Sequence, residues 1–307
     1  MSRAFNFLVA AVLGCIIPLA RAATPDSPER YVVNLSPASK VGDRYHILSK
    51  TTEKSDVSTF RAHGVKSTRH IDDVVELDGV VQVAKIDSRG NETSLECTVN
   101  HLQVTREGGS PLDVVPQGAV ISTTTSPLPP GERFQRFVTL RPGRQITPEQ
   151  FRLINRVLTA RAPEAPTIQD IFGSGTAQLV GGSWAINRER GCKYYAELQM
   201  QIEPRDFVGK SQFVGIEKLG SRDFFRIDAT AKAAKYVSTF TSNVKTDKAM
   251  FSMKFSQWVP KAGGHFGKTV SETHEEFRGN GVDANVQGFR SEGVSDLLSE
   301  ITIEPVK

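Results

Sequence analysis

Histidine and cysteine are the residues of this sequence best suited to metal or nucleophilic chemistry, with six and three copies. No histidine belongs to an HExxH motif, and His274 lacks the second ligand four residues on that a helical zinc site needs. On a strand, His274 and Glu276 would share a face, which leaves a weak metal site open. We favour a solvated polar strand there, because charged strand faces are commonly exposed. No metal centre is predicted.

A covalent nucleophile needs a base within hydrogen-bond reach, and no sequence motif supplies such a pair. Ser174 lies between glycines but without the spacing of a G-x-S-x-G elbow. Cys97 and His101, four residues apart, would share a strand face at a separation of ~13 Å. The adjacent pairs Asp72–Asp73 and Glu275–Glu276 would point to opposite faces, so neither makes the acid–base couple of a glycosidase.

The segment 262–269, AGGHFGKT, is a near miss for a phosphate-binding loop, with Ala262 in place of the first glycine. In such a loop Lys268 would reach phosphate oxygens, but no helical pattern follows Thr269 to provide the anion-binding N-terminus. We therefore interpret the segment as a glycine-rich hairpin loop.

Two cysteines, Cys97 and Cys192, lie outside the N-terminal apolar run. An exported chain could oxidise them to one disulfide, but their spacing does not establish a pair. Leu95, Cys97 and Val99 alternate with polar residues, which predicts that Cys97 is a small core residue. There is no CxxC motif, and no cofactor is predicted.

The elements that would carry these residues are mostly strands. In the clearest run, 196–203, every second residue is apolar, and 249–256 repeats the pattern. Further runs cover 74–86, 224–231 and 300–306, separated by glycine-bearing turns. A period of two gives one wet and one buried face, as in antiparallel sheets.

One segment is a clear helix signal. Residues 147–150, TPEQ, combine an N-cap, a proline at the first helical position and a capping-box partner. Phe151, Ile154 and Leu158 then form one apolar stripe that would dock on a sheet, and the prolines within 163–166 end the helix.

Three other segments carry weaker signals. Residues 167–173 predict a helical turn capped by Thr167. The AKAAK stretch at 231–235 is open between helix, from its composition, and strand, from the alternation before it. The proline-bearing segment 122–133 predicts an extended loop.

The chain also repeats itself. The phrase V-G-x-x-aromatic-x-I occurs at 41–47 and 180–186, and a block of matching apolar and glycine positions occurs at 83–97 and 213–227. The distance from phrase to block differs by nine residues, which a longer hairpin around 53–72 would absorb. We infer an internal duplication. Glycine suits a turn and the aromatic residue suits burial, so the phrase marks architecture rather than a ligand cage.

Residues 1–22 predict a secretory signal peptide. The run 5–19 is almost wholly apolar, and Ala20 and Ala22 form the small-x-small cleavage pattern. The run is too short for a strong transmembrane span. An alternative is a lipobox with Cys15 as a lipidated anchor, but we favour cleavage after Ala22.

Cleavage would remove two arginines and lower the net charge from +4 to about +2. With so small a net charge, the chain lacks the dense basic surface that binds the phosphate backbone of nucleic acid. Nucleic acid is therefore not an expected partner. The remaining chain of about 285 residues is long enough for two ordinary domains. We expect an exported protein, periplasmic or extracellular.

The predicted fold class is mainly β. Two similar antiparallel β-rich halves, each a curved sheet in the form of a half-barrel or sandwich, would be bridged by a short helix. The expected domains after the signal peptide are the first repeat at 23–145, the helix and proline linker at 146–166, and the second repeat at 167–307.

This organisation resembles uncharacterised secreted bacterial proteins with repeated β-rich halves. More distantly it resembles the lipoprotein-carrier proteins of the cell envelope, whose curved antiparallel sheet closes over helices and holds acyl chains. The resemblance covers the organisation of about 29–306 and transfers no functional residue, so the catalytic and ligand-binding residues stay unassigned.

Three functions remain open. The first is a non-catalytic exported β-protein that binds an apolar ligand, or an envelope protein, at the junction of the halves. The second is a hydrolase with a site assembled from scattered residues, for which His101, His274 and nearby carboxylates are the candidates. The third is a structural envelope component that associates through sheet edges.

Overall fold

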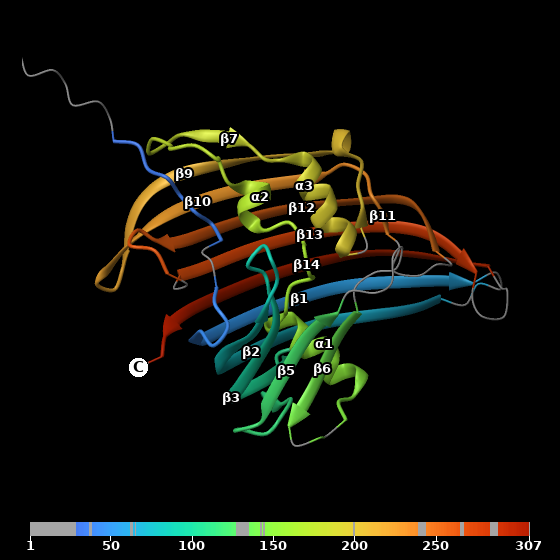
Figure 1. Ribbon diagram of the computed structural model, residues 1–307. Helices are drawn as coiled ribbons and strands as arrows, with labels where there is room; N and C mark the ends of the chain where they lie inside the picture. The colour runs from blue at the N-terminus through green and yellow to red at the C-terminus, as the bar shows by residue number, and fades with distance from the viewer. Residues whose placement is uncertain are drawn as a thin grey trace, which may run out of the picture.

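The computed structural model describes residues 29–36, 39–61, 64, 66–126, 135–141, 143, 145–198, 200–238, 244–264, 267–282 and 288–306. The predicted signal peptide and Cys15 lie outside this part of the chain. Most described residues belong to one large, curved antiparallel sheet with few helices, as the alternation predicted (Figure 1).

The sheet has twelve strands, in the order β6-β5-β3-β2-β1-β14-β13-β12-β10-β9-β7, with β4 paired to β3 beside this path. The first half provides β1 (Arg44–Arg61), β2 (Lys66–Ile86), β3 (Glu92–Arg106), β4 (Leu112–Asp113), β5 (Val120–Ser126) and β6 (Gln135–Arg141). The second half provides β7 (Ser183–Ala185), β9 (Phe207–Leu219), β10 (Arg222–Ala233), β12 (Val244–Pro260), β13 (Gly267–Val282) and β14 (Gly288–Pro305). Strands β8 (Met200–Gln201) and β11 (Val237–Ser238) form a separate ribbon.

Residues paired across neighbouring strands share a face of the sheet. Thr51, Ser299, Ser271 and Phe255 are paired in sequence across β1, β14, β13 and β12, and they define what we call the inner face. All the described α-helices pack on this face: Thr51 bonds to α1 and Phe255 stacks on a phenylalanine of α2. The opposite, outer face carries most of the charged residues.

Helix α1 (Pro148–Val157) begins at the predicted capping box, in which Thr147 and Gln150 each bond to the other's backbone. Its buried residues are Leu153, Ile154 and Val157. Leu158 is also buried, whereas Phe151, expected in the same stripe, is 36% exposed. The buried side of the helix is therefore rotated slightly from the predicted one, and it closes the core of the first half.

Helix α2 (Ile168–Phe172) is the turn predicted from Thr167, which caps it. Helix α3 (Arg188–Glu197) was not predicted, and it corrects the strand expected at 196–203. The alternation there is real, but only β8 is extended; residues up to Glu197 close the helix, whose Gly191 and Tyr195 face the core. The 3-10 turn η1 (Pro204–Asp206) then leads into β9.

Two further expectations are resolved. The segment 231–235 is strand as far as Ala233, the end of β10. The loop expected at 122–133 is wrong in its first part, because β5 runs to Ser126 and pairs with both β3 and β6. Residues 127–134 lie outside the described residues.

The two copies of the repeated phrase occupy equivalent places in the sheet. Tyr45 is the second residue of β1 and pairs with Val81, two residues before the repeated block. Trp184 lies in β7 and pairs with Ser211, again two residues before its block. In both halves the block forms the next hairpin, β2–β3 or β9–β10. Most of its apolar positions are buried on the inner face, but Ile216 is 37% exposed.

Because every pairing is antiparallel, strand direction can be followed across the sheet. The five strands β1, β2, β3, β5 and β6 have counterparts of the same direction and spatial order in β7, β9, β10, β12 and β13. The halves are thus parts of one continuous sheet rather than separate half-barrels or sandwiches, and β14 fills the single strand position between them. The domain limits expected from the sequence stay predictions.

Candidate functional site

A cleft of about 810 Å³ opens on the inner face where the two halves meet. Its floor is formed by β12, β13 and β14, and α2, α3 and the β2–β3 turn surround it. Apolar side chains make up much of the lining: Leu35, Ile168, Tyr194, Met253, Phe255, Ile301 and Ile303.

The segment before β1 closes one side of this cleft. Val33 and Leu35 are buried in the core of the second half, although the chain then continues into β1 of the first half. Two glutamine side chains hold it: Gln169 accepts a hydrogen bond from the Leu35 amide at 2.7 Å, and Gln257 donates to the Leu35 carbonyl oxygen at 3.0 Å. Segment 29–36, in blue in Figure 1, thus ties the second half to the chain that begins the first.

The opposite wall is the β2–β3 turn with the linker after α1. The Asp87 carboxylate accepts from the backbone amides of Asn91 and Glu164, and the Asn91 amide group donates to the carbonyl oxygen of Ala165. Hydrogen bonds to Asp87 hold its pKa below the usual range although burial opposes this. The linker is therefore fixed against the first half at the cleft.

An ion pair joins the β2–β3 turn to α2. The guanidinium of Arg89, in the β2–β3 turn, lies 2.6 Å from the carboxylate of Asp170 in α2. Both side chains are about a quarter exposed, at 27%. Asp170 also accepts from Thr167, and these hydrogen bonds lower the pKa of Asp170 against the opposing effect of burial.

Other charged groups in the lining have partners, with one exception. Glu92 accepts hydrogen bonds from the hydroxyls of Ser39 and Tyr45, and Lys268 pairs with Glu300. Arg161 makes no ion pair among the described residues, and its Nη1 atom is buried without a hydrogen-bond partner. Because Arg161 lines the cleft without an ion pair, its guanidinium is available to an anionic ligand group there.

Three more buried polar atoms of the lining are unpartnered in the described part of the chain: Arg89 Nε, Asn91 Oδ1 and Gln257 Oε1. The cleft therefore combines an apolar floor with polar side chains that also line it, such as those of Arg89, Asn91 and Gln257. Such a combination is typical of small-molecule sites, where a few polar groups fix the orientation of a mostly apolar ligand.

Glu197, at the end of α3, is a carboxyl group whose pKa is raised. Burial raises its pKa to about 7, and the positive charge of Arg161 opposes that rise. The side chain is half-buried and is not part of the cleft lining. A carboxyl group that titrates near neutrality could serve as an acid or base, but no histidine or nucleophile lies against it in the described structure.

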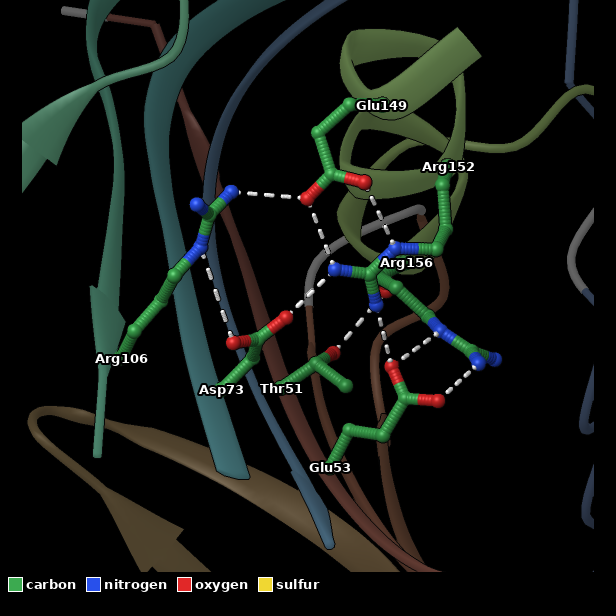
Figure 2. A network of polar contacts seen from close by, with 7 residues as sticks. All are labelled: Thr51, Glu53, Asp73, Arg106, Glu149, Arg152 and Arg156. Atoms are coloured by element: carbon green, nitrogen blue, oxygen red, sulfur yellow. Dashed lines mark hydrogen bonds and ion pairs between the residues drawn. The ribbon is translucent and has the colours of Figure 1, made fainter. Parts of the chain in front are cut away.

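A second cluster of charged groups lies beneath α1 (Figure 2). Glu53 of β1 accepts from Arg152 and Arg156, and Asp73 of β2 accepts from Arg152. The side chains of Glu53 and Asp73 are only 5% and 7% exposed. We call the full set the α1 network: Thr51, Glu53, Asp73, Arg106, Glu149, Arg152 and Arg156.

The α1 network is internally balanced, with three carboxylates facing three guanidinium groups. The hydrogen bond from Arg152 lowers the pKa of Glu149, and the bonds of Arg152 to Glu149 and Asp73 raise its own pKa although burial opposes this. Every carboxylate is held by arginine, so none is available as a base or nucleophile. The network fixes α1 to the sheet.

The histidines named for a hydrolase do not meet. His101 is on the outer face of β3 beside Asp78, and His274 is on the outer face of β13, bonded to Asp296 and Glu276. Three strands separate β3 from β13, which puts them ~19 Å apart across the sheet. His274 and Glu276 do share a face, as expected for a strand.

Cys97 is fully buried, as predicted, and burial raises the pKa of its thiol to about 12. A bulge at Asn100 puts Cys97 and His101 on opposite faces, which corrects the shared face expected from their spacing. Cys192 is half-buried in α3, and both cysteines are free thiols. Ser174 lies in an exposed turn where its hydroxyl bonds to Thr176.

Within the segment 262–269, residues 262–264 follow β12 and residues 267–269 begin β13, so its described part joins two paired strands as the hairpin interpretation requires; residues 265 and 266 lie outside the described residues. Across the described residues, no group of three or more His, Cys, Asp or Glu side chains is placed to hold a metal ion. None of the helices in the described chain is long and apolar enough to cross a membrane.

Sequence reasoning missed the residues that shape the cleft. Arg161, Arg89 and Gln257 come from the linker, a turn and a strand, and no motif joins them. Arg161 lies between Ala160 and Ala162 in the proline-rich linker. Only the structure shows that both alanines are buried, so no signal in the sequence set Arg161 apart.

No protein-family model matches the chain, and no curated protein matches its sequence. An outer membrane channel of Pseudomonas putida F1 aligns with 87% of this chain and 97% of its own, at 7% identity and a TM-score of 0.21. A LolA-superfamily protein of Nitrosomonas europaea aligns with 84% of this chain and 86% of its own, at 7% identity and a TM-score of 0.12. The P. putida toluene transporter TodX aligns with 88% of this chain and 92% of its own, at 5% identity and a TM-score of 0.14. Similarity at this level carries no argument about function.

Proposed function

We propose that this chain is an exported, non-catalytic β-protein that binds a small molecule with an apolar part in the cleft. The cleft carries the proposal: its volume of about 810 Å³ falls within the range of ~300–1,000 Å³ typical of small-molecule sites. Export is proposed from the signal-peptide pattern of residues 1–22.

The apolar floor favours a ligand with an apolar part. Phe255 is buried against Phe172 of α2, whereas Ile301 and Ile303 of β14 are only half-buried and face the cleft. Their remaining exposed surface gains ~25 cal/mol for each Å² removed from water, so an apolar group that covers them is stabilised there.

The site is also built from a rigid frame. The β2–β3 turn, the linker and α2 are joined by hydrogen bonds and by the Arg89–Asp170 ion pair, and the floor belongs to the middle of the sheet. A preformed cleft loses little conformational entropy when a ligand enters.

A hydrolytic function has less support, because His101 and His274 lie apart on the outer face and neither lines the cleft. Glu197 has a shifted pKa, but no nucleophile or histidine accompanies it in the described structure. A hydrolase usually needs such groups within hydrogen-bond reach of one another.

The test is to extract the natively purified protein with organic solvent and identify bound small molecules by mass spectrometry. The variant Ser271→Trp would fill the cleft from β13, since Ser271 lies on the inner face and lines it. Ser256→Trp, on the outer face of neighbouring β12, is the matched control. We expect the ligand to copurify with the wild type and with Ser256→Trp, and to be lost from folded Ser271→Trp.

The proposal fails if no small molecule is recovered and native mass spectrometry shows only the mass of the polypeptide. It also fails if Ser271→Trp retains the molecule at the wild-type ratio, because the ligand would then lie elsewhere. Recovery of a stoichiometric protein instead of a small molecule would support an envelope protein partner.

A further inference from the structure

We infer that Arg161 binds an anionic group of the ligand, so that the cleft selects amphipathic anions, in which an apolar chain carries a carboxylate or phosphate. The inference rests on the proposed function and names its ligand class.

The position of Arg161 is fixed by its backbone. Its amide donates to the carbonyl oxygen of Glu92 at 2.8 Å, and its own carbonyl oxygen accepts from the hydroxyl of Thr125. The flanking Ala160 and Ala162 are buried in the first half. The guanidinium therefore starts from an anchored backbone and reaches the cleft that it lines.

Arg161 is half-buried and makes no ion pair with a residue that the structure describes. Its Nη1 atom is buried with no hydrogen-bond acceptor in the described structure. The carboxylate of Glu92, whose backbone holds Arg161, accepts instead from Ser39 and Tyr45. An anionic group in the cleft would give the exposed part of the Arg161 guanidinium a charge-assisted hydrogen bond, which guanidinium forms well with carboxylate and phosphate.

Other donors lie in the same lining. Arg89 uses Nη2 for Asp170, which leaves its buried Nε without an acceptor among the described residues. The remaining cation of the lining, Lys268, is paired with Glu300. The free hydrogen-bonding capacity of the cleft's cations is thus on the side of the linker and the β2–β3 turn.

This polar side faces an apolar one. Ile301 and Ile303 of β14 and Phe255 of β12 lie in the same cleft as Arg161. A ligand that satisfies both parts needs an apolar chain and a negatively charged end. Neutral apolar molecules would cover the floor but leave Arg161 unpaired.

The test is titration calorimetry of the full chain with three probes that share one alkyl chain: dodecanoate, dodecyl phosphate and dodecan-1-ol. We expect wild-type protein to bind both anions about tenfold to a hundredfold more tightly than the alcohol, the range for one hydrogen bond to a charged group. This comparison needs no variant, so it holds even if substitutions disturb folding.

Three variants locate the effect. Arg161→Gln should lose the preference for the anions while its affinity for dodecan-1-ol stays unchanged. Arg161→Lys should keep part of the preference, because it keeps the charge but not the planar fork. Arg188→Gln removes an equal charge from an exposed site in α3 and should behave as the wild type.

The outcomes separate the two proposals. Equal affinity of wild-type protein for the anions and the alcohol, or an unchanged preference in folded Arg161→Gln, overturns the role of Arg161 and leaves the cleft as an apolar site. Failure of all three probes to bind, combined with no copurified ligand, overturns the proposed function itself.

Discussion

The backbone amides of Gly42 and Gly181 make the same hydrogen bond in the two halves of the sheet. Gly42 donates to the carbonyl oxygen of Val83 at 2.9 Å, and Gly181 donates to that of Phe213 at 2.7 Å. Both glycines have positive φ angles, 90° and 82°. The turn that introduces each half thus depends on a backbone conformation that L side chains rarely adopt.

We expect Gly181→Ala and Gly42→Ala each to lower the free energy of unfolding by ~1–2 kcal/mol. A Cβ would meet nothing within 4 Å at either glycine, so the cost comes from the φ angle and not from a clash. Gly288→Ala is the control, because a Cβ there also meets nothing and its φ is ordinary. Urea unfolding followed by circular dichroism measures all three. Equal effects at Gly181 and Gly288 would contradict the conformational explanation.

Glu53→Gln should destabilise the protein strongly, because it removes the negative charge shared by Arg152 and Arg156 and replaces one acceptor oxygen by an NH2 donor, in a site where Glu53 is 5% exposed. Loss of one partner from a buried ion pair costs ~3–5 kcal/mol, and partial exposure of the arginines puts the expected value at the lower end. Glu76→Gln breaks the exposed Lys50–Glu76 pair and should cost ~0–1 kcal/mol. Chemical denaturation of both variants tests whether the α1 network holds the helix to the sheet; a Glu53→Gln effect no larger than that of Glu76→Gln would show that it does not.

The pKa of Glu197 predicts a pH dependence of stability. Burial raises it from 4.5 to about 7, so between these values the unfolded chain releases a proton that the folded chain retains. The folded state then binds more protons, and stability falls as pH rises through this window. Glu197→Gln should remove that part of the fall and be more stable than the wild type above pH ~7. The measurement is the free energy of unfolding of both proteins at several pH values. If the free energy of unfolding changes with pH in the same way in both proteins, Glu197 does not have the raised pKa.

The thiols should differ in reactivity. Burial raises the pKa of Cys97 to about 12 and its side chain is fully buried, whereas Cys192 is only half-buried. A thiol reagent at mildly alkaline pH should label Cys192 first and Cys97 only on unfolding. Peptide mapping after labelling assigns the sites, and Cys192→Ser should abolish the early reaction. Rapid labelling of Cys97 in the folded variant would contradict its burial.

Local patterns were enough to predict the fold class. The alternation at 249–256 lies within β12, where Phe251 and Phe255 are buried on the inner face as expected. The capping box at Thr147 starts α1, because its signal depends only on residues within one turn. The duplicated phrase could be aligned from spacing alone, since each glycine and aromatic residue has the same role in its half.

Non-local packing explains what could not be predicted. The alternation at 196–203 fits a strand, yet Tyr195 packs against Phe207 and Phe251, and burying that ring favours a helix up to Glu197. A period-two pattern assigns the faces of a strand by counting residues, and it cannot reveal a bulge that adds one residue. The bulge at Asn100 therefore puts His101 on the face opposite to the expected one.

The candidate site was beyond sequence reasoning for the same reason. Its polar residues come from segments as far apart as positions 89 and 257, with Arg89 in a turn, Arg161 in the linker and Gln257 in β12. They meet only because β14 joins the two halves into one sheet. A site made by that junction leaves no compact motif in the sequence.

The central position of β14 also constrains the order of folding. It is the last strand of the sheet to be synthesised, yet it pairs with β1, the first, along almost its entire length. Until it arrives, β1 and β13 both present long unpaired edges, which in a nascent chain are templates for aggregation. Such a chain gains from being kept unfolded by chaperones until translation is finished. A premature stop before Gly288 would remove β14 from the middle of the sheet and separate β1 from β13, instead of removing a strand at the edge.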